Sequence, residues 1–284
     1  MKNNFIIQLA KAQNKKNRKN VSIMIFTIAI VLLGMYSIFT LLFGKINVDK
    51  VQAIRNNGTT AAGLILNGEE KQKEEIEKLN YIDTIGSINQ IGMLVENDQE
   101  FAQIAICNEK TFNNFFMPAY TNVVGKFPEY SDEVMLSIST LNKMGIEHPK
   151  IGMDIPISIL WRDWTKNEDK AASYMMRLSG YFTEYLNKSV QEVPAYLSKK
   201  FLIAENLEEY PSNIFFEVKS NGYEKEELEE QILKEVSTNE KQKVVIIESN
   251  EREAWEKALG GYGVAITCGG ILLLGMFLLI YNLM

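Results

Sequence analysis

The sequence has few of the residues that most often carry chemistry: one histidine, His148, and two cysteines, Cys107 and Cys268. A single histidine is too few for the common zinc sites and leaves no pattern typical of a Ser-His-Asp triad. The cysteines lie in different environments, one in the polar body and one in an apolar run. We expect both to be small buried hydrophobic residues. The sequence therefore predicts no catalytic residue and no metal site.

The sequence also lacks the Gly-x-x-x-x-Gly-Lys-Ser/Thr loop that holds nucleotide phosphates. We therefore expect no cofactor and no enzymatic activity in this chain. It has no basic patch with interleaved aromatic residues, and its long central part is acidic, which opposes binding to nucleic acid. These absences argue against catalysis and against nucleic-acid binding by this chain.

Two long uncharged runs are present. Val21 to Phe43 has 23 residues, and as a helix it is ~34 Å long, enough to cross a hydrocarbon core of about 30 Å. It is too long for the apolar part of a signal peptide, so we expect an uncleaved anchor. The second run, Ala258 to Met284, is also long enough to span. Since a loop usually follows such a span, we expect a part of a longer protein; a tail ending at the membrane face is the alternative.

Charge is distributed unevenly around the first run. Residues 1–20 carry six basic residues and no acid. The other 24 Lys and Arg and all 36 acidic residues lie between 45 and 257, which gives that span a net charge of −12. By the positive-inside rule, we expect a cytoplasmic N-terminus and an extracellular body, residues 45–257.

One pattern occurs twice in the body: an apolar run, an Asn-Gly turn, a charged helix and a second apolar run. The first copy has its runs at Thr60–Leu66 and Tyr81–Ile91, and the second at Asn213–Lys219 and Val244–Ile247. Two such β-α-β units can share one sheet with the helices on one face, as in a ferredoxin-like split fold. The apolar stripe of the second helix is formed by Leu228, Ile232, Leu233 and Val236.

The part between the copies is richer in β-branched and aromatic residues. Its candidate strands are Glu133–Ser137, Asp154–Leu160, Arg177–Phe182 and Ala195–Leu197, with one helical turn at Leu141–Met144. The predicted fold class is an α+β extracellular domain between two transmembrane helices. The predicted segments are a cytoplasmic basic segment (1–20), membrane helix 1 (21–44), the first half of the β-α-β part (45–105), a β-rich insertion (106–204), the second half (205–257) and membrane helix 2 (258–284).

Within the insertion, Gly125 to Ile157 carries an ordered series of short motifs that resembles FtsX/MacB-like ABC transporter permeases. The residues that carry the resemblance are Gly125 and Pro128, Glu133, Leu136-Ser137, Met144-Gly145-Ile146 and Ile151-Gly152. The family's Asp after Ile-Gly is displaced, because Met153 precedes Asp154. LSGYF at 178–182 and AYLSKKF at 195–201 resemble the strands that follow. The three glycines and Pro128 are typical of turns, so this series indicates a fold rather than a site.

The resemblance implies a MacB-type core, with a ferredoxin-like "porter" part interrupted by a β-rich "sabre" part. It implies a permease subunit that couples ATP hydrolysis by a separate cytoplasmic ATPase to movement of the extracellular domain. It also implies a second permease copy or module as partner, and a peptide or other cell-envelope substrate. The Asn-, Lys- and Ile-rich composition is typical of low-GC bacteria and favours peptide export or antimicrobial-peptide resistance, and the acidic body would attract cationic peptides.

Three sets of residues are candidates for a functional role. Trp161 and Trp164 flank a charged loop and are candidate partner contacts. Gly260, Gly261 and Gly263 are a candidate hinge. Ala265 and Gly269 are a small-xxx-small pair suited to close helix packing.

Two other functions fit the same layout of helix, outside domain and helix. One is a membrane sensor, such as a histidine kinase or chemoreceptor, and the other is an anchored extracellular scaffold. More hydrophobic spans after Met284 would favour the transporter. A charged linker and a kinase-like or coiled-coil segment would favour the sensor.

Overall fold

The computed structural model describes residues 7, 18–96, 99–163, 168–185, 195–207, 212–219 and 222–283. At some of these positions, mostly in the C-terminal helix, only the backbone is described. The chain falls into two compact units. The first combines Met1–Asp49 with Ala254–Met284, and the second is Lys50–Glu253. Each unit is described by itself.

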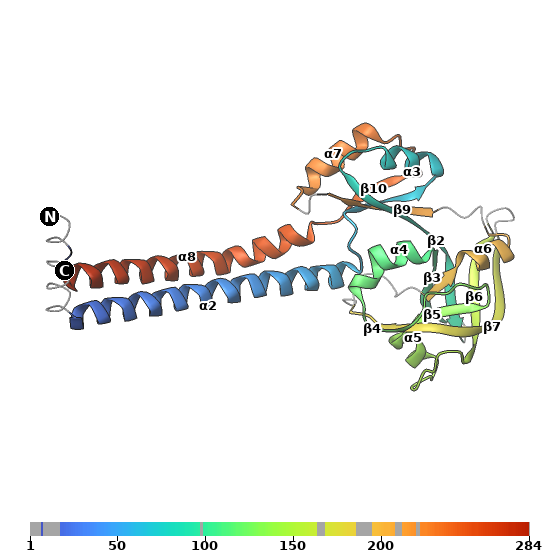
Figure 1. Cartoon of the computed structure of the whole chain (residues 1–284). Helices are drawn as coiled ribbons and strands as arrows, with labels where there is room; N and C mark the ends of the chain where they lie inside the picture. Colours follow the sequence, from blue (N-terminus) through green and yellow to red (C-terminus); the bar gives the residue numbers. More distant parts are fainter. Residues whose placement is uncertain are drawn as a thin grey trace. The chain divides into compact units, whose positions relative to one another are not determined.

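The first unit is a pair of helices, α2 (Arg18–Asn57) and α8 (Asn250–Leu283), which lie side by side (Figure 1). Leu42 and Ile46 of α2 pack with Ala254 of α8, and the backbone at Gly34 lies close to Leu272. The buried and half-buried positions of α2 repeat in steps of three and four, the spacing of a coiled-coil seam. Among them are Met24, Ile28, Val31, Met35, Ile38, Leu42 and Ile46.

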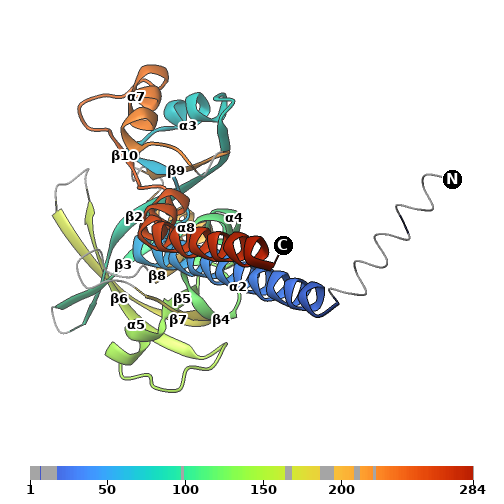
Figure 2. The same ribbon diagram turned by 90° about the vertical axis from the view of Figure 1, so that its left-hand side faces the viewer.

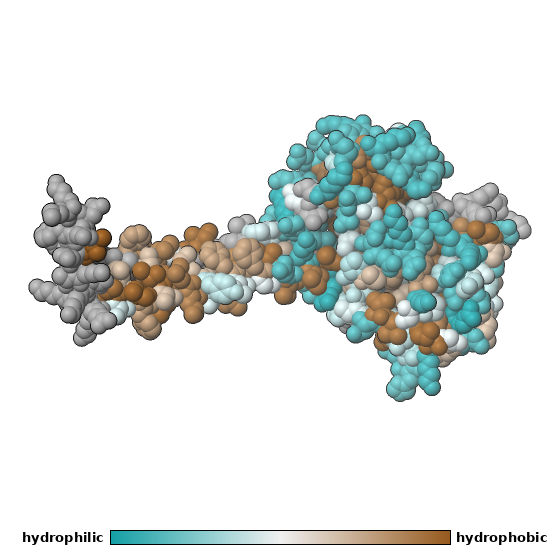
Figure 3. Space-filling model, viewed as in Figure 1, coloured by the Kyte–Doolittle hydropathy of each residue, from teal (hydrophilic) through white to brown (hydrophobic). Residues whose placement is uncertain are grey.

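Outside these positions, α2 between Val21 and Phe43 is mostly apolar and exposed, as the brown surface of the helix pair in Figure 3 shows. Only 6% of its most apolar window is buried, and the segment Val21–Asn57 is long and apolar enough to cross a membrane. The hydroxyls of Ser37 and Thr40 donate to carbonyl oxygens one turn earlier, at 2.9 Å each. Polar groups satisfied within the helix suit lipid surroundings. The predicted first membrane helix is therefore supported.

In α8, the described residues give a shorter apolar segment, Ile266–Leu278. This segment is below the length of a span, so the second membrane helix stays a prediction. Cys268 corrects an expectation: its side chain is exposed on α8, whereas Cys107 of the second unit is fully buried.

The second unit is a mixed α+β domain rich in strands. Its strands are β1 (Gly63–Gly68), β2 (Ile82–Glu96), β3 (Gln99–Cys107), β4 (Thr121–Gly125), β5 (Glu133–Ser137), β6 (Asp154–Asp163), β7 (Glu168–Thr183), β8 (Ala195–Ser198), β9 (Ser212–Val218) and β10 (Lys243–Ile246). Its helices are α3 (Glu70–Glu77), α4 (Glu109–Thr111), the π-helix η1 (Phe112–Phe116), the 3-10 turn η2 (Met117–Ala119), α5 (Ile138–Lys143), α6 (Lys199–Ala204) and α7 (Lys225–Glu235).

The two predicted β-α-β copies form one sheet in the order β10-β1-β9-β2, with antiparallel neighbours throughout. Helices α3 and α7 lie on the same face of this sheet (Figures 1 and 2). Ile76 of α3 and Ile232 of α7 enter one core with strand residues such as Ile65. The prediction that two β-α-β units share one sheet, with the helices on one face, is therefore confirmed. Leu233 corrects the predicted stripe, because its side chain is 49% exposed.

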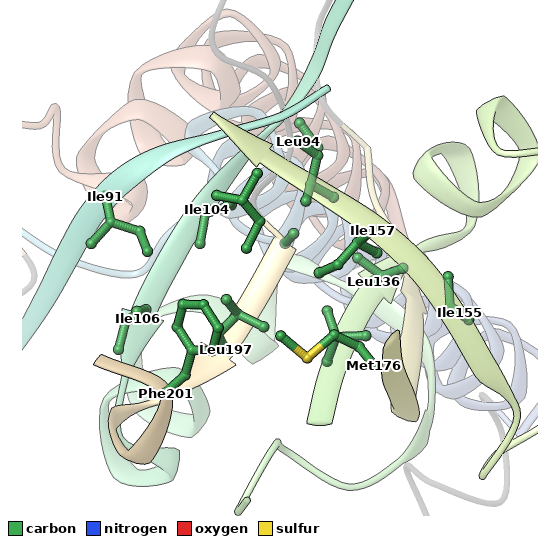
Figure 4. Packing of buried hydrophobic residues seen from close by; sticks show 14 of the residues in the cluster. Ile91, Leu94, Ile104, Ile106, Leu136, Ile155, Ile157, Met176, Leu197 and Phe201 are labelled. Atoms are coloured by element: carbon green, nitrogen blue, oxygen red, sulfur yellow. The ribbon is translucent and has the colours of Figure 1, made fainter. Parts of the chain in front are cut away.

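Strand β2 continues past this sheet into a closed ring of six strands. The ring runs β2-β3-β8-β5-β7-β6 and returns to β2, since β6 pairs with both β7 and β2. Its interior is filled by aliphatic side chains from every strand, among them Ile91, Ile104, Leu136 and Ile157 (Figure 4). The ring includes the second half of β2 and most of β3, which come before residue 106. The predicted segment boundaries stay predictions.

All four strands predicted between the two copies are present, as β5, β6, β7 and β8, and β6 and β7 are longer than predicted. The helical turn predicted at Leu141–Met144 belongs to α5. Gly125, Gly145 and Gly152 have φ of 86°, 74° and 85°, so their expected role as turn residues is confirmed. Strands β3 and β4 were not predicted.

A third cluster, mostly aromatic, packs where η1 meets the strands. Phe115 and Phe116 of η1 approach Phe215 of β9, with ring centroids 6.2 and 5.1 Å apart. Tyr120 and Tyr196 share a hydrogen bond of 2.9 Å between their buried hydroxyls. This cluster joins the four-stranded sheet to the six-stranded ring.

Candidate functional site

The candidate residues from the sequence lie in separate places. Trp161 is on β6 and is half-buried against the ring's core. Trp164 lies outside the described residues. At Gly260, Gly261 and Ala265 only the backbone is described, and α8 runs through all three without a break. Their roles stay predictions.

Gly263 of the candidate hinge and Gly269 of the candidate packing pair also lie on α8. A Cβ added at Gly263 or Gly269 would meet no other described atom within 4 Å. Among the described residues, no helix therefore packs closely on Gly269. The role of Ala265 and Gly269 as a small-xxx-small pair for close helix packing stays a prediction.

One groove of the second unit, about 380 Å³ in volume, lies along β2. It includes Trp161. The groove is lined by Asn67, Gln90, Ile91, Gly92, Met93, Glu100, Gln103, Leu160, Trp161, Arg162 and Asp169. We call it the β2 groove.

The β2 groove lies where two strands share one edge of β2. Strand β9 pairs with this edge up to Asn89, and β6 pairs with it from Met93 onward. Between them, residues 90–92 have no strand partner on this edge among the described residues. Gly92 makes this arrangement sterically feasible, since a Cβ there would lie 2.1 Å from the carbonyl oxygen of Leu160. The groove therefore follows from the exchange of partners along one long strand.

Side-chain amides form a connected row along the groove. Gln90 donates from Nε2 to Oε1 of Gln103 at 3.1 Å and accepts at Oε1 from Nδ2 of Asn213 at 3.0 Å. Asn213 in turn accepts at Oδ1 from the backbone N–H of Asn67 at 3.2 Å. Asn67 has φ of 53° and donates from Nδ2 to the carbonyl of Lys241. A row of amides presents donors and acceptors in alternation without net charge.

Charged groups lie at the outer part of the groove. Arg162 and Asp169 face each other across the β6–β7 hairpin with 3.3 Å between Nη1 and Oδ1. Glu100 is exposed on β3 and has no ion pair among the described residues. With Trp161 alongside, the groove has one aromatic wall, a neutral polar floor and an excess of negative charge.

The buried titratable groups of the aromatic cluster are structural. Burial raises the pKa of the Cys107 thiol and of the Tyr120 and Tyr196 hydroxyls far above their usual values. These groups therefore stay protonated, and Cys107 is no thiolate nucleophile. The pKa of Glu217 on β9 is raised by partial burial and by Asp83. Among the described residues, no three His, Cys, Asp or Glu side chains are placed to hold a metal ion.

Sequence reasoning found only one wall of the β2 groove, Trp161. It missed the row of amides, because Gln90, Gln103 and Asn213 are ordinary polar residues in the sequence. Their relation depends on the pairing of β2 with β3 and β9.

No protein-family model matches this sequence, and no curated protein matches it. The chain is similar in structure to the periplasmic region of MacB from Actinobacillus actinomycetemcomitans, at 12% sequence identity and a TM-score of 0.42. The similarity covers 72% of this chain and 95% of that chain.

Proposed function

We propose that this chain is a transmembrane subunit of a bacterial ABC transporter of the FtsX/MacB type, in which a separate cytoplasmic ATPase moves the extracellular domain. The second unit is then the porter-like sheet with the sabre-like ring inserted. A second permease copy or module completes the assembly in the plasma membrane.

The observation that carries this proposal is the continuity of α2. One helix, Arg18–Asn57, contains the apolar segment and ends inside the second unit at Gly58, whose φ is 69°. Thr60 then donates from its backbone N–H to the carbonyl of Phe115 at 2.9 Å, and from its hydroxyl to Asn114 at 2.8 Å. A displacement of α2 along its axis would therefore pull directly on η1 and the aromatic cluster.

Further contacts fix the end of α2 within the second unit. The Arg55 guanidinium lies 4.4 Å from the ring centroid of Tyr185, and Asn57 donates to Asn250 of α8 at 2.8 Å. Both helices are thus joined at their domain ends. This arrangement supports a chain that passes movement between membrane and domain, and it suits a transporter better than a scaffold.

The order of motifs in Gly125–Ile157 gives separate support. Its glycines occupy left-handed turn positions, as a fold-determining series requires. The acidic second unit, extracellular by the positive-inside rule, favours export of, or resistance to, cationic peptides. Peptide transport and antimicrobial resistance are the functions we propose on this basis.

The test is association with an ATPase encoded beside this gene. We expect the full-length protein to co-purify with that ATPase and to change its rate of ATP hydrolysis. Gln52 is exposed in the domain end of α2. Gln52→Pro would remove a helical hydrogen bond at a cost of about 3 kcal/mol, and we expect it to alter that rate while the ATPase stays bound.

Gln52→Ala is the matched control, because alanine keeps the helix, and its hydrolysis rate should equal that of the wild type. A protein that associates with no ATPase would overturn the proposal. An unchanged rate in Gln52→Pro would contradict the role of α2.

A further inference from the structure

We propose that η1 is a conformational switch, whose π-helical turn converts into an α-helical turn when the segment that follows α2 is displaced. The cause of that displacement rests on the proposed function, but the two forms of η1 can be tested in this chain without an ATPase. Failure of the switch is therefore separate from failure of the transporter proposal.

The helical segment that contains η1 changes its pitch twice. It begins as the α turn α4, widens into the π-helix η1 and ends as the 3-10 turn η2. In η1 the carbonyl of Phe112 accepts from the N–H of Met117, five residues later, whereas an α-helix uses the fourth residue. Single π turns are rare and occur frequently at functional sites. This turn therefore has one residue more than an α turn needs.

The additional residue lies on the outer face of η1. The three phenylalanines of η1 are buried in the aromatic cluster, whereas Asn113 is exposed and Asn114 is half-buried. Asparagine is a weak helix former that favours caps and turns. The turn can therefore gain or lose one residue on this face without removing a side chain from the core.

The inner face of the same segment is fixed by β2. A Cβ added at Gly86 would lie 2.7 Å from Cγ2 of Thr111 and 2.8 Å from the ring of Phe115. The strand backbone thus approaches the helical segment as closely as glycine allows. A change of pitch is therefore left to the outer face and to the residues that follow η1.

The segment that follows α2 binds two carbonyls at the end of η1. Thr60 donates from its hydroxyl to the Asn114 carbonyl at 2.8 Å and from its backbone N–H to the Phe115 carbonyl at 2.9 Å. The last carbonyls of a helix have no partner within it, so external donors determine how the last turn is closed. A displacement of Thr60 therefore acts on the π turn itself.

Conversion of η1 has a defined consequence for the strands that follow. In the α form the Phe112 carbonyl accepts from Phe116, and the next residues shift by one helical position, about 1.5 Å along the axis. These residues are η2 and Tyr120, after which β4 begins. Tyr120 stacks on Phe182 of β7. The switch therefore links the end of α2 to β4 and β7.

The first experiment deletes Asn113 from the full chain in lipid nanodiscs. The deletion gives η1 the α spacing, so we expect the melting midpoint to stay within about 2 °C of the wild type. Deletion of Glu230, an exposed residue of α7, is the matched control. It turns the buried Ile232 away from its core by about 100°. This control should lower the midpoint by roughly 5–10 °C.

Hydrogen exchange of the peptide that covers η1, followed by mass spectrometry, tests the role of Thr60. Thr60→Val removes the bond to Asn114 and should speed exchange at η1 about fivefold, as expected for one lost hydrogen bond. Thr60→Ser keeps the hydroxyl and should match the wild type. In the Asn113 deletion, Thr60→Val should leave exchange close to that of the deletion alone, because the turn then has no second form.

A third measurement relates the switch to the proposed function. The Asn113 deletion should bind the ATPase encoded beside this gene and leave its hydrolysis rate at that of the ATPase alone. Absence of a bound ATPase would overturn the transporter proposal, and the first two experiments would still decide whether η1 switches.

Three results would overturn the switch. The Asn113 deletion could lower the midpoint as much as the Glu230 deletion, which would show that packing requires the π turn. Thr60→Val could exchange at the rate of the wild type. The Asn113 deletion could change the hydrolysis rate of a bound ATPase as the wild type does.

Discussion

At the scale of single residues, two hydroxyls in the aromatic cluster of the second unit depend on each other for hydrogen bonding. Tyr120 and Tyr196 are buried, with 8% and 0% of their surface exposed. Their hydroxyls satisfy each other at 2.9 Å, and Tyr120 stacks on Phe182 with centroids 4.2 Å apart. A buried hydroxyl that loses its partner is costly, whereas a pair removed together is not.

This predicts a specific pattern in a double-mutant cycle. Tyr196→Phe should lower the free energy of unfolding by about 1–3 kcal/mol, because the Tyr120 hydroxyl is left buried without a partner. Tyr120→Phe should cost a similar amount. The double variant should cost clearly less than the sum of the two. Urea titration of the full chain in detergent measures all three values.

The control for this cycle is Tyr130→Phe. Tyr130 is 49% exposed, so its change should stay within about 0.5 kcal/mol. Costs of the two single variants that simply add would show that the hydroxyls do not depend on each other.

At the scale of elements, β2 is the strand that belongs both to the four-stranded sheet and to the six-stranded ring of the second unit. Its first half, Ile82–Asn89, pairs with β9, and its second half pairs with β3 and β6. The register against β3 shifts between Gln90 and Gly92, which is a bulge. At this bulge the strand leaves one sheet for the other, and the groove opens beside it.

Gly92 is therefore predicted to be intolerant of a side chain. In Gly92→Ala the new Cβ would lie 2.1 Å from the Leu160 carbonyl oxygen and 3.0 Å from the Cα of Trp161, both backbone atoms. We expect a loss of about 1–3 kcal/mol in the free energy of unfolding, as for overpacking. Thermal unfolding in detergent measures the loss as a lower midpoint.

Gly222→Ala is the matched control. Gly222 has open space around an added Cβ and no left-handed backbone, so its effect should be within about 0.5 kcal/mol. Equal midpoints for the two variants would contradict the close packing of β6 on β2.

The same bulge explains which strands of the second unit could be predicted from the sequence and which could not. The two β-α-β copies were predictable because each is local and has its own apolar runs, turn and helix. The continuation of β2 to Glu96 and strand β3 were not, since a bulge breaks the two-residue alternation on which strand prediction depends. Ring closure by β6 and β2, and hence the β2 groove, joins residues far apart in sequence. Only Trp161 gave a local signal.

At the scale of the whole molecule, the chain combines one helix that is long and apolar enough to cross a membrane with a domain whose charge is strongly negative. Within Val21–Asn57, the most apolar window has only 6% of its residues buried, and such exposure is unfavourable in water but not in lipid. Six basic residues lie before it and an acidic domain after it. These facts predict an N-terminus in the cytoplasm and residues 45–257 outside the cell.

Cysteine labelling in intact cells tests this orientation. Glu147→Cys places a thiol on an exposed loop, and it should react with a membrane-impermeant maleimide without permeabilisation. Lys15→Cys, in the basic head, should react only after permeabilisation. The background should be low because Cys107 is fully buried with a raised pKa. Cys268→Ala removes the exposed thiol of α8. Labelling of Lys15→Cys in intact cells would reverse the orientation, and with it the proposal that an ATPase acts at the N-terminal side of α2.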